Sequence, residues 1–410
     1  MREDRKIAAL LFVNFFLIIV IYSVVRPVRG ALVVDQLGAE SLPYIWIYTA
    51  LVLAIFVAIY GRLIDLVSPR WVMTLTATGF AVGLLWLRYC VLLQFPLAKQ
   101  AFYVWGDVFS VVMIEQVWSF TNDVFDTETA KRVYGFIGSG AILGGILGSF
   151  GTRYLVGRVG TYRLLDVSFG LLLVLVVCCY LTQKIRAPGG AARSPQLGFD
   201  GDAFALVARQ PYLRLILVMV LLTQLISTVI DYKFNWLMQL QYPYLDDKTR
   251  FLAGVNAWIN VVSLAVTLAV AGPVHRYLGV ATGLLFLPVF NLFMLGLAIF
   301  VPGPSVLTGL KLGDKSLNYS IYRLSKEHLY IPTASEAKYK AKAVIDMFVH
   351  RFSDLLGAGL ILVVAVRYLS LCLAILTLVV IGMSLLVARA YRAKVGETGA
   401  EIALAPEIIS

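Results

Sequence analysis

The sequence predicts an all-α polytopic membrane protein with twelve transmembrane helices in two pseudo-symmetric halves of six. Only 14% of its 410 residues are charged, whereas a soluble domain has about 25%, and the mean hydropathy is +0.83. The apolar residues form runs of about 20, long enough to cross a hydrocarbon core of roughly 30 Å. Because these runs lack the alternation of a transmembrane β-barrel strand, they indicate helices.

The apolar runs define the predicted spans, and a Pro- and Gly-rich stretch separates the first six from the last six. We place the spans at residues 7–34, 44–65, 71–93, 100–121, 133–157, 163–182, 212–236, 250–272, 279–302, 304–325, 341–366 and 368–391. No small-residue cleavage site follows the first run, so we interpret it as a retained helix and not a signal peptide. The expected organisation is a six-helix half over 1–182, a cytoplasmic linker over 183–211, a second half over 212–394 and a flexible tail over 395–410.

The two halves resemble each other at the turn between their fourth and fifth spans. Residues 126–132 (DTETAKR) in the first half parallel residues 335–340 (SEAKYK) in the second. Two related six-helix halves are typical of the major facilitator architecture. Asp65 and Arg70 also match part of that superfamily's cytoplasmic loop motif, although its central glycine and first basic residue are missing.

Membrane topology explains the excess of basic residues. The formal net charge is +11, which in a soluble protein would suggest a nucleic acid partner. Here the Lys and Arg residues fall in alternate short loops and not on one face, as the positive-inside rule expects. We therefore predict no nucleic acid partner, and both termini on the cytoplasmic side of a bacterial inner membrane.

Charged residues inside the predicted spans mark the candidate site, because each costs about 2.5–3.5 kcal/mol on insertion scales. They gather in spans 1, 4, 7 and 10, which line the central cavity in the major facilitator architecture. Polar residues at helical spacing share faces with them. The predicted substrate-binding residues are Arg26, Arg29, Asp107, Glu115, Asp231, Lys233, Asn235, Lys311, Lys315, Asn318 and Tyr322.

These charges predict an anionic solute. If Asp314 is included, the four spans hold five cations and four carboxylates. Arginine suits bidentate recognition of phosphate or carboxylate, and lysine acts as a point charge. The carboxylates could hold unoccupied lysines in place or take up protons. The structural alternative is that all of them form interhelical ion pairs that hold the bundle together.

The Gly-rich segment 135–148 indicates helix packing. It lacks the Gly-Lys-Ser/Thr of a nucleotide-binding P-loop, and no strand precedes it. Gly140, Gly144 and Gly148 are four residues apart, which lets two helices approach closely and in the fifth span would permit the halves to rock. Since no nucleophile–base or metal-ligand pattern is found, we predict no enzyme, no cofactor and no metal site.

Four stretches of the sequence form a specific set of motifs: Tyr22–Val34, Phe102–Asp107, Ala130–Tyr134 and Lys326–Asp346. Together they resemble the ATP/ADP translocase family of plastids and obligate intracellular bacteria, with its broader bacterial branch. The resemblance implies that the solute is ATP or ADP, and that the positions of Arg29, Asp107 and Asp231 belong to the substrate site. This sequence departs from the family there, because Arg29 replaces a lysine, Asp107 replaces a longer Glu, and Asn235 stands where relatives have a basic residue.

The cytoplasmic loops supply a second set of candidate residues, which would act as a gate that holds the two halves together. The set comprises Asp65, Arg70, Glu128, Lys131, Arg132, Lys326, Glu327, Lys338 and Asp346.

The leading hypothesis is ATP/ADP exchange by alternating access. The arginines of span 1 and the lysines of span 10 would hold phosphates, while the carboxylates organise these cations or carry protons. The alternatives are a proton-coupled carrier of another organic anion and a non-transporting receptor or assembly membrane protein. The expected partners are the lipid bilayer and a small anionic solute, with protons added on the second hypothesis.

Overall fold

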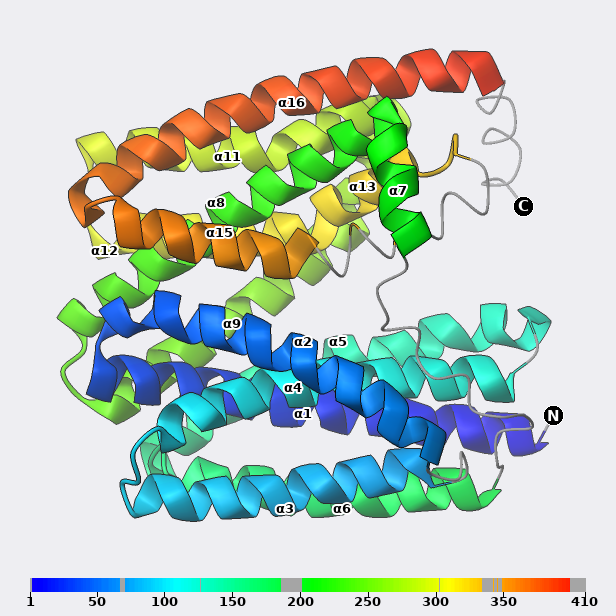
Figure 1. Ribbon diagram of the computed structural model, residues 1–410, viewed down its shortest axis with the longest axis vertical. Coiled ribbons are helices and arrows are strands. Elements are labelled where there is room, and N and C mark those ends of the chain that lie inside the picture. Colours follow the sequence, from blue (N-terminus) through cyan, green and yellow to red (C-terminus); the bar gives the residue numbers. More distant parts are fainter. Residues whose placement is uncertain are drawn as a thin grey trace. The chain divides into compact units, whose positions relative to one another are not determined.

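The computed structural model consists of helices and their connections (Figure 1). It describes residues 2–66, 71–125, 127–185, 201–301, 303–333, 342, 345 and 349–398, and these residues contain no β-strand. The elements before residue 200 are α1 (Arg2–Leu37), η1 (Ala39–Ser41), α2 (Leu42–Leu66), α3 (Val72–Leu92), α4 (Ala98–Val124), α5 (Thr127–Val159) and α6 (Arg163–Ile185). The later elements are α7 (Gly201–Arg209), α8 (Pro211–Gln241), α9 (Leu245–Val266), η2 (Thr267–Ala271), α10 (Gly272–Tyr277), α11 (Gly279–Phe300), α12 (Pro304–Leu317), η3 (Asn318–Tyr322), α13 (Arg323–Leu329), α15 (Val349–Val363), η5 (Val366–Tyr368) and α16 (Leu369–Thr398).

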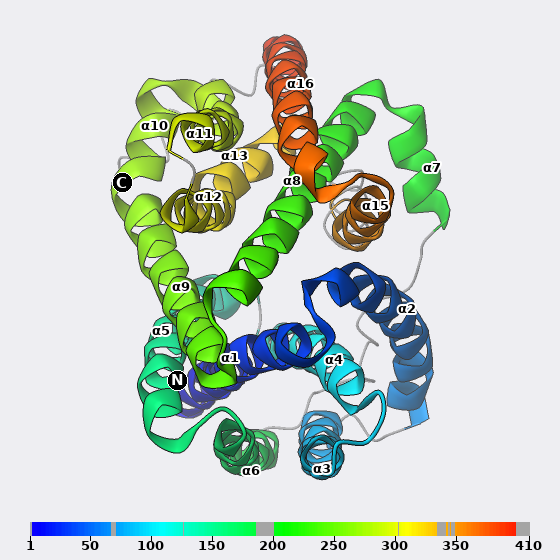
Figure 2. The ribbon, with the colours of Figure 1, turned by 90° about the vertical axis from the view of Figure 1, so that its left-hand side faces the viewer.

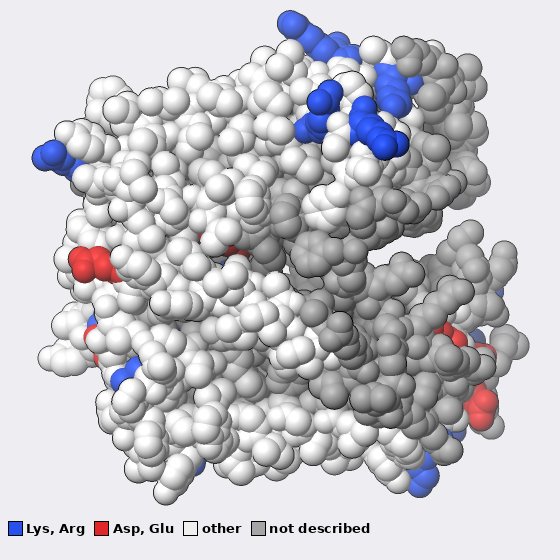
Figure 3. Space-filling model, viewed as in Figure 1, with Lys and Arg blue, Asp and Glu red and all other residues white. Residues whose placement is uncertain are grey.

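Nine helical stretches among the described residues are long and apolar enough to cross a membrane. They coincide with nine of the predicted spans, and charged residues are few on the face drawn in Figure 3. The other three predicted spans correspond to α4, to the continuous run α12–η3–α13 and to α15. The all-helical polytopic class is therefore confirmed, while the count of twelve spans stays a prediction.

The chain forms two compact units that do not follow the predicted division at the linker. Unit 1 comprises Met1–Gly198 together with Met238–Asn260, and unit 2 comprises Phe199–Leu237 together with Val261–Ser410. The end of α8 and most of α9 therefore pack in unit 1, although both helices belong to the second half of the sequence.

Part of the predicted linker and the start of the predicted flexible tail are helical. Helix α6 continues to Ile185, and α7 forms inside the linker because Phe204 and Val207 pack on the core of unit 2. Helix α16 extends to Thr398, and Val395 within that extension is buried. Apolar side chains thus carry helical structure beyond the boundaries that composition predicted. Residues 186–200 and 399–410 lie outside the described part of the chain.

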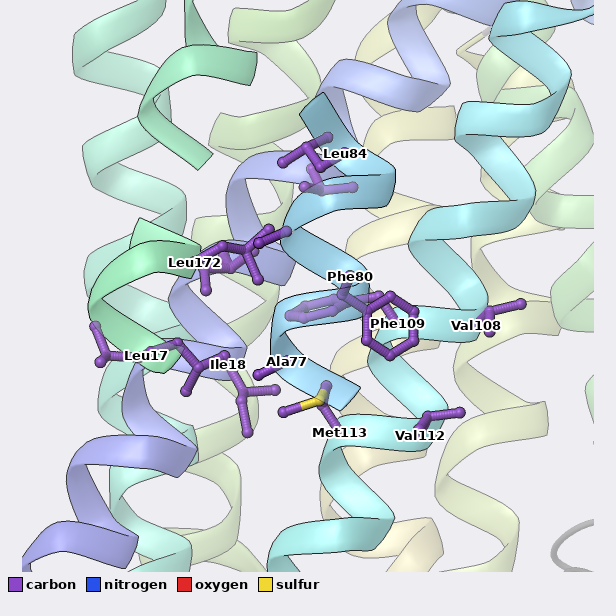
Figure 4. Packing of buried hydrophobic residues seen from close by; sticks show 14 of the residues in the cluster. Leu17, Ile18, Ala77, Phe80, Leu84, Val108, Phe109, Val112, Met113 and Leu172 are labelled. Carbon is purple, nitrogen blue, oxygen red and sulfur yellow. The ribbon is translucent and has the colours of Figure 1, made fainter. Parts of the chain in front are cut away.

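Helix α1 lies at the centre of unit 1, between α4 and α5 and next to α6 (Figure 2). Because lipid tails are as apolar as these side chains, close van der Waals packing of α1 against its neighbours stabilises the arrangement, and transfer out of water does not. Figure 4 shows part of this core, in which side chains from α1, α3, α4 and α6 meet. The labelled residues are Leu17, Ile18, Ala77, Phe80, Leu84, Val108, Phe109, Val112, Met113 and Leu172.

Gly140, Gly144 and Gly148 of α5, which we call the α5 glycine ladder, lie directly against α1. A Cβ added at Gly140 would lie 2.6 Å from the carbonyl oxygen of Phe12, and one added at Gly144 would lie 2.6 Å from that of Phe16. The two backbones can approach this closely only because the glycines have no side chain. The packing role predicted for these glycines is confirmed. Their partner α1 belongs to the same unit, however, so the contact does not support the predicted role in rocking between halves.

Polar contacts tie the connection between α8 and α9 to unit 1. Lys248 Nζ lies 2.7 Å from Asp35 Oδ1 at the end of α1, and Gln239 Oε1 accepts a hydrogen bond of 2.6 Å from the backbone N–H of Ala39. Asp246 Oδ1 accepts hydrogen bonds from the backbone N–H and the hydroxyl of Thr161, at 2.7 and 2.6 Å. We call these contacts the α8–α9 turn cluster.

Unit 2 contains a π-helical turn at the position of predicted span 10. Within this unit α11 packs against both α12 and α16. The turn η3 joins α12 to α13 without a break in the helix. A π turn inserts extra backbone into one turn of the helix and is frequent at functional sites. Asn318 and Tyr322, predicted to share a face with the lysines of α12, are its first and last residues.

Candidate functional site

Arg29 is the centre of the charged cluster in unit 1. It is 5% exposed, and its Nη2 donates to Asp107 Oδ1 at 2.6 Å while its Nη1 donates to the carbonyl oxygen of Tyr103 at 2.6 Å. The guanidinium carbon lies 4.3 Å from the centroid of the Tyr103 ring. Tyr103 and Asp107 are one turn apart on α4, so one helix face supplies a carboxylate, a carbonyl and an aromatic ring. The structure thus brings Arg29 and Asp107, two of the predicted site residues, together.

A glycine makes room for Arg29 against α4. A Cβ added at Gly106 would lie 3.0 Å from Arg29 Cδ and 3.1 Å from Arg29 Nη1. On α1, the Tyr22 ring lies near both arginines of the span, 5.9 Å from the guanidinium carbon of Arg26 and 5.8 Å from that of Arg29. Arg26 is less buried than Arg29. The arginines therefore share an aromatic neighbour, and Arg29 is the more deeply buried of the two.

The cluster in unit 2 is built around the Asp231 carboxylate of α8. Lys311 Nζ forms a close ion pair with Asp231 Oδ1, and Lys315 Nζ lies 3.3 Å from Asp231 Oδ2. The two lysines are one turn apart on α12, which brings both ammonium groups to the same carboxylate. The lysine side chains are only 7% and 11% exposed, whereas that of Asp231 is 23% exposed. Two cations therefore converge on one anion that solvent can reach more easily than it reaches either lysine.

A second carboxylate lies deeper beside the same lysines. Asp314 is fully buried and accepts hydrogen bonds from the Ser227 hydroxyl at 2.5 Å and from Asn291 Nδ2 at 2.8 Å. Lys315 Nζ donates to Ser227 Oγ at 2.7 Å. Ser227 and Asn291 were missed as candidates. The signal for Ser227 was its position four residues before Asp231, on the same face of α8, whereas no spacing pointed to Asn291 on α11.

Other predicted residues of these spans have different partners. Lys233 donates to Ser370 Oγ, and Asn235 Nδ2 donates to the carbonyl oxygen of Asp231 at 2.7 Å. Tyr322 is buried, and its hydroxyl donates to Thr223 Oγ1 at 3.0 Å. Asn318 is also buried. The two lysines that pair with Asp231 are therefore Lys311 and Lys315. Lys233, which the sequence analysis also assigned to the substrate-binding residues, contacts Ser370 instead.

Glu115 is a partly buried carboxylate on α4, two turns beyond Asp107. In the described part of the chain no ion pair joins it to a cation. The two clusters nevertheless consist mainly of interhelical ion pairs. The same geometry is expected if these charges serve only to hold the helix bundle together. Which of these charges contacts a solute therefore stays a prediction.

The predicted cytoplasmic gate is described only in part. Arg70, Lys338 and Asp346 lie outside the described residues, as do the side chains of Asp65, Glu128 and Lys131. Arg132 is exposed, and Lys326 is buried. Glu327 Oε2 lies 2.7 Å from Lys342 Nζ, and both side chains are about one-third exposed. This ion pair lies in the segment that carries the Lys326–Asp346 motif, within unit 2.

Comparison with known proteins identifies relatives over most of the chain. A family model described as TLC ATP/ADP transporter matches residues 2–99 and 310–394. ADP,ATP carrier protein 1 of Chlamydia pneumoniae is 26% identical over 438 residues, covering 87% of this chain and 84% of the relative. ADP,ATP carrier protein 5 of Rickettsia felis is 25% identical over 291 residues, covering 60% and 57%.

Solved transporter structures share the fold. A point mutant of the nucleoside transporter NupG has a TM-score of 0.67 at 16% identity, over 95% of this chain and 99% of the other. A bacterial homologue of the human lysosomal transporter Spinster has a TM-score of 0.65 at 11% identity, over 96% and 98%. At these identities the likeness establishes the helical transporter fold alone. The motifs, the partial match to the family model and the carrier relatives agree, and the chain is similar to the TLC ATP/ADP transporters.

Proposed function

We propose that this protein is a multi-pass carrier that exchanges ATP and ADP across a bacterial inner membrane by alternating access. The similarity to ADP,ATP carrier proteins supports the nucleotide as solute. The observation that carries the proposal is the convergence of Lys311 and Lys315 on the Asp231 carboxylate in unit 2. Three charges placed in this way inside spans would be costly without a function or a compensating partner.

Asp231 occupies the position that we assign to a substrate phosphate. A carboxylate and a phosphate both offer anionic oxygens to ammonium donors. Because the Asp231 side chain is more exposed than either lysine, an incoming anion would reach the carboxylate side of the cluster first and compete for both ammonium groups. In the empty carrier, Asp231 would then serve as the counter-charge that keeps Lys311 and Lys315 in place.

Arg29 has the corresponding role in unit 1. Two of its N–H groups are engaged by Asp107 and by the Tyr103 carbonyl, and a guanidinium has five N–H donors. The remaining donors could hold a phosphate oxygen, with Arg26 as the less buried second arginine. Asp107 would fix the orientation of Arg29. The Asp107 side chain is shorter than that of the Glu that relatives have at this position.

For orientation, we propose that both termini lie in the cytoplasm. Exposed basic residues at the ends of the described helices, such as Arg132, Lys184 and Arg392, support this assignment through the positive-inside rule. Fusions of alkaline phosphatase and green fluorescent protein to the C-terminus would test it. A fluorescent, phosphatase-negative C-terminus is expected, and the opposite pattern would contradict the orientation.

A second candidate function is proton-coupled transport of another organic anion. Glu115 favours it, because this partly buried carboxylate has no ion pair with a described cation and could therefore take up a proton during the cycle. The two candidates differ in whether uptake needs a counter-substrate.

Proteoliposomes separate these functions. Vesicles loaded with ADP should take up labelled ATP, while empty vesicles should not, and a pH gradient should have little effect. Uptake that ignores internal ADP but follows the pH gradient would favour the second candidate. Replacement of Lys315 by Ala should abolish exchange, whereas replacement of the exposed Lys184 by Ala, as a matched control, should leave it unchanged.

A further inference from the structure

Lys315 lies between two carboxylates that differ in exposure and in partners. Asp231 is 23% exposed and is shared with Lys311. Asp314 is fully buried, and its two oxygens accept hydrogen bonds from Ser227 and Asn291. One carboxylate can therefore be reached by a solute, while the other is enclosed by protein.

A side chain of the neighbouring helix α8 links Asp314 to Lys315. Ser227 of α8 bridges them, with its Oγ 2.5 Å from Asp314 Oδ2 and 2.7 Å from Lys315 Nζ.

The chemistry of the groups fixes the direction of each hydrogen bond in this chain. A lysine ammonium can only donate, so the Ser227 oxygen must accept from Lys315. The single hydroxyl proton of Ser227 is then directed to Asp314. Asn291 donates to the other oxygen of Asp314 at 2.8 Å, so both carboxylate oxygens are hydrogen-bonded.

We propose that Asp314 is a positioning residue, which through Ser227 holds Lys315 in place for a polyanionic substrate while Asp231 gives way to that substrate. This inference rests on the proposed function, in which phosphates displace Asp231. It divides the counter-charges of unit 2 into an exchangeable one, Asp231, and a fixed one, Asp314. Because Asp314 is buried, an anion that replaces Asp231 beside Lys315 would leave the contact of Lys315 with Asp314 through Ser227 in place.

The matched variants Ser227→Ala and Ser227→Thr test the bridge in the full-length protein. Ser227→Ala removes the hydroxyl, and we expect the KM for ATP in the exchange assay to rise about tenfold or more, with kcat within about twofold of the original. Ser227→Thr keeps the hydroxyl and should restore the original KM. A purely structural defect would instead lower kcat per vesicle and would not distinguish the two variants.

Thermal stabilisation of the detergent-solubilised protein by pyrophosphate gives a second readout that needs no transport. The unmodified protein and Ser227→Thr should be stabilised, and Ser227→Ala should need about tenfold more pyrophosphate for the same shift. If the protein exchanges no nucleotide but shows this pattern, the positioning role stands and the proposed function fails.

Three results would overturn the inference. They are an unchanged KM and pyrophosphate requirement in Ser227→Ala, equal losses in Ser227→Ala and Ser227→Thr, and the absence of any stabilisation by pyrophosphate in the unmodified protein. Should Ser227→Ala fail to fold, Asp314→Asn keeps the shape of the side chain and removes its charge. It should raise KM in the same way, and an unchanged KM would count against the proposal.

Discussion

Replacing two rungs of the α5 glycine ladder by alanine should separate α5 from α1. In the double variant Gly140→Ala, Gly144→Ala, each new Cβ would lie 2.6 Å from a carbonyl oxygen of α1. Ordinary van der Waals contact begins at 3.4 Å, so the two backbones must move apart by about 0.8 Å at both positions. The oxygens belong to backbone and cannot move aside as a flexible side chain could.

The expected cost follows from this geometry. Overpacking of a tightly packed contact costs about 1–3 kcal/mol per site, so the pair should lose about 2–6 kcal/mol. Alanine also favours the helix over glycine by about 0.5–1 kcal/mol per residue, which partly hides the loss. An unfolding entropy of about 2.1 cal/mol/K per residue implies roughly 1 °C per kcal/mol for a chain of 410 residues.

A matched control removes the helix-propensity effect. Gly135 and Gly151 lie on the same helix, and an added Cβ at either position meets nothing within 4 Å. The control double variant Gly135→Ala, Gly151→Ala gains the same propensity without the clash. Its melting temperature in detergent, followed by tryptophan fluorescence, should exceed that of the ladder variant by about 2–7 °C. If the two variants melt within about 1 °C of each other, the close approach of α1 and α5 is not a source of stability.

Three further predictions concern charged residues in unit 1. Asp107→Asn removes the counter-charge of the buried Arg29, a change that costs up to about 3–5 kcal/mol when the pair is buried. ATP uptake per folded carrier should therefore fall at least tenfold. A normal uptake rate would show that transport does not depend on the pair of Arg29 and Asp107. Lys248→Met leaves Asp35 without its lysine and should lower the melting temperature, while the double variant Lys248→Met, Asp35→Asn should be no less stable than the single one. Additive losses in that cycle would mean that the two side chains do not interact. Gly106→Ala should displace the Arg29 guanidinium by a few tenths of an ångström and raise the KM for ATP, with little change in melting temperature. An unaltered KM would show that the position of Arg29 is not critical for ATP binding.

The charged helices could be predicted from the sequence because a charge in a span stands out against an apolar background. Arg29 and Asp107 lie on predicted spans 1 and 4, Asp231 and the α12 lysines lie on predicted spans 7 and 10, and the structure pairs them. The glycine ladder was predictable for a related reason, since its four-residue spacing marks a continuous stripe of small residues on one helix.

The remaining contacts depend on how separate helices align, which a single sequence does not encode locally. Ser227 and Asn291 are ordinary polar residues until α8 and α11 place them on either side of Asp314. The π turn η3 contains Asn318 and Tyr322, and no feature of α-helical spacing in the sequence predicts such a turn. The assignment of residues 238–260 to unit 1 follows from contacts of the α8–α9 turn cluster, not from any shift in composition.

That assignment has a consequence for the synthesis of the protein. Residue 260, the last of unit 1, emerges 62 residues after residue 198, where the first part of that unit ends. At about 5–20 residues per second, unit 1 remains incomplete for roughly 3–12 s after its first six long helices have been made. During this interval Asp35 has no Lys248 to pair with and Thr161 has no Asp246, because those partners have not yet been translated. The membrane insertion machinery therefore handles a first set of helices in which Asp35 and Thr161 gain their polar partners only after α9 has been translated.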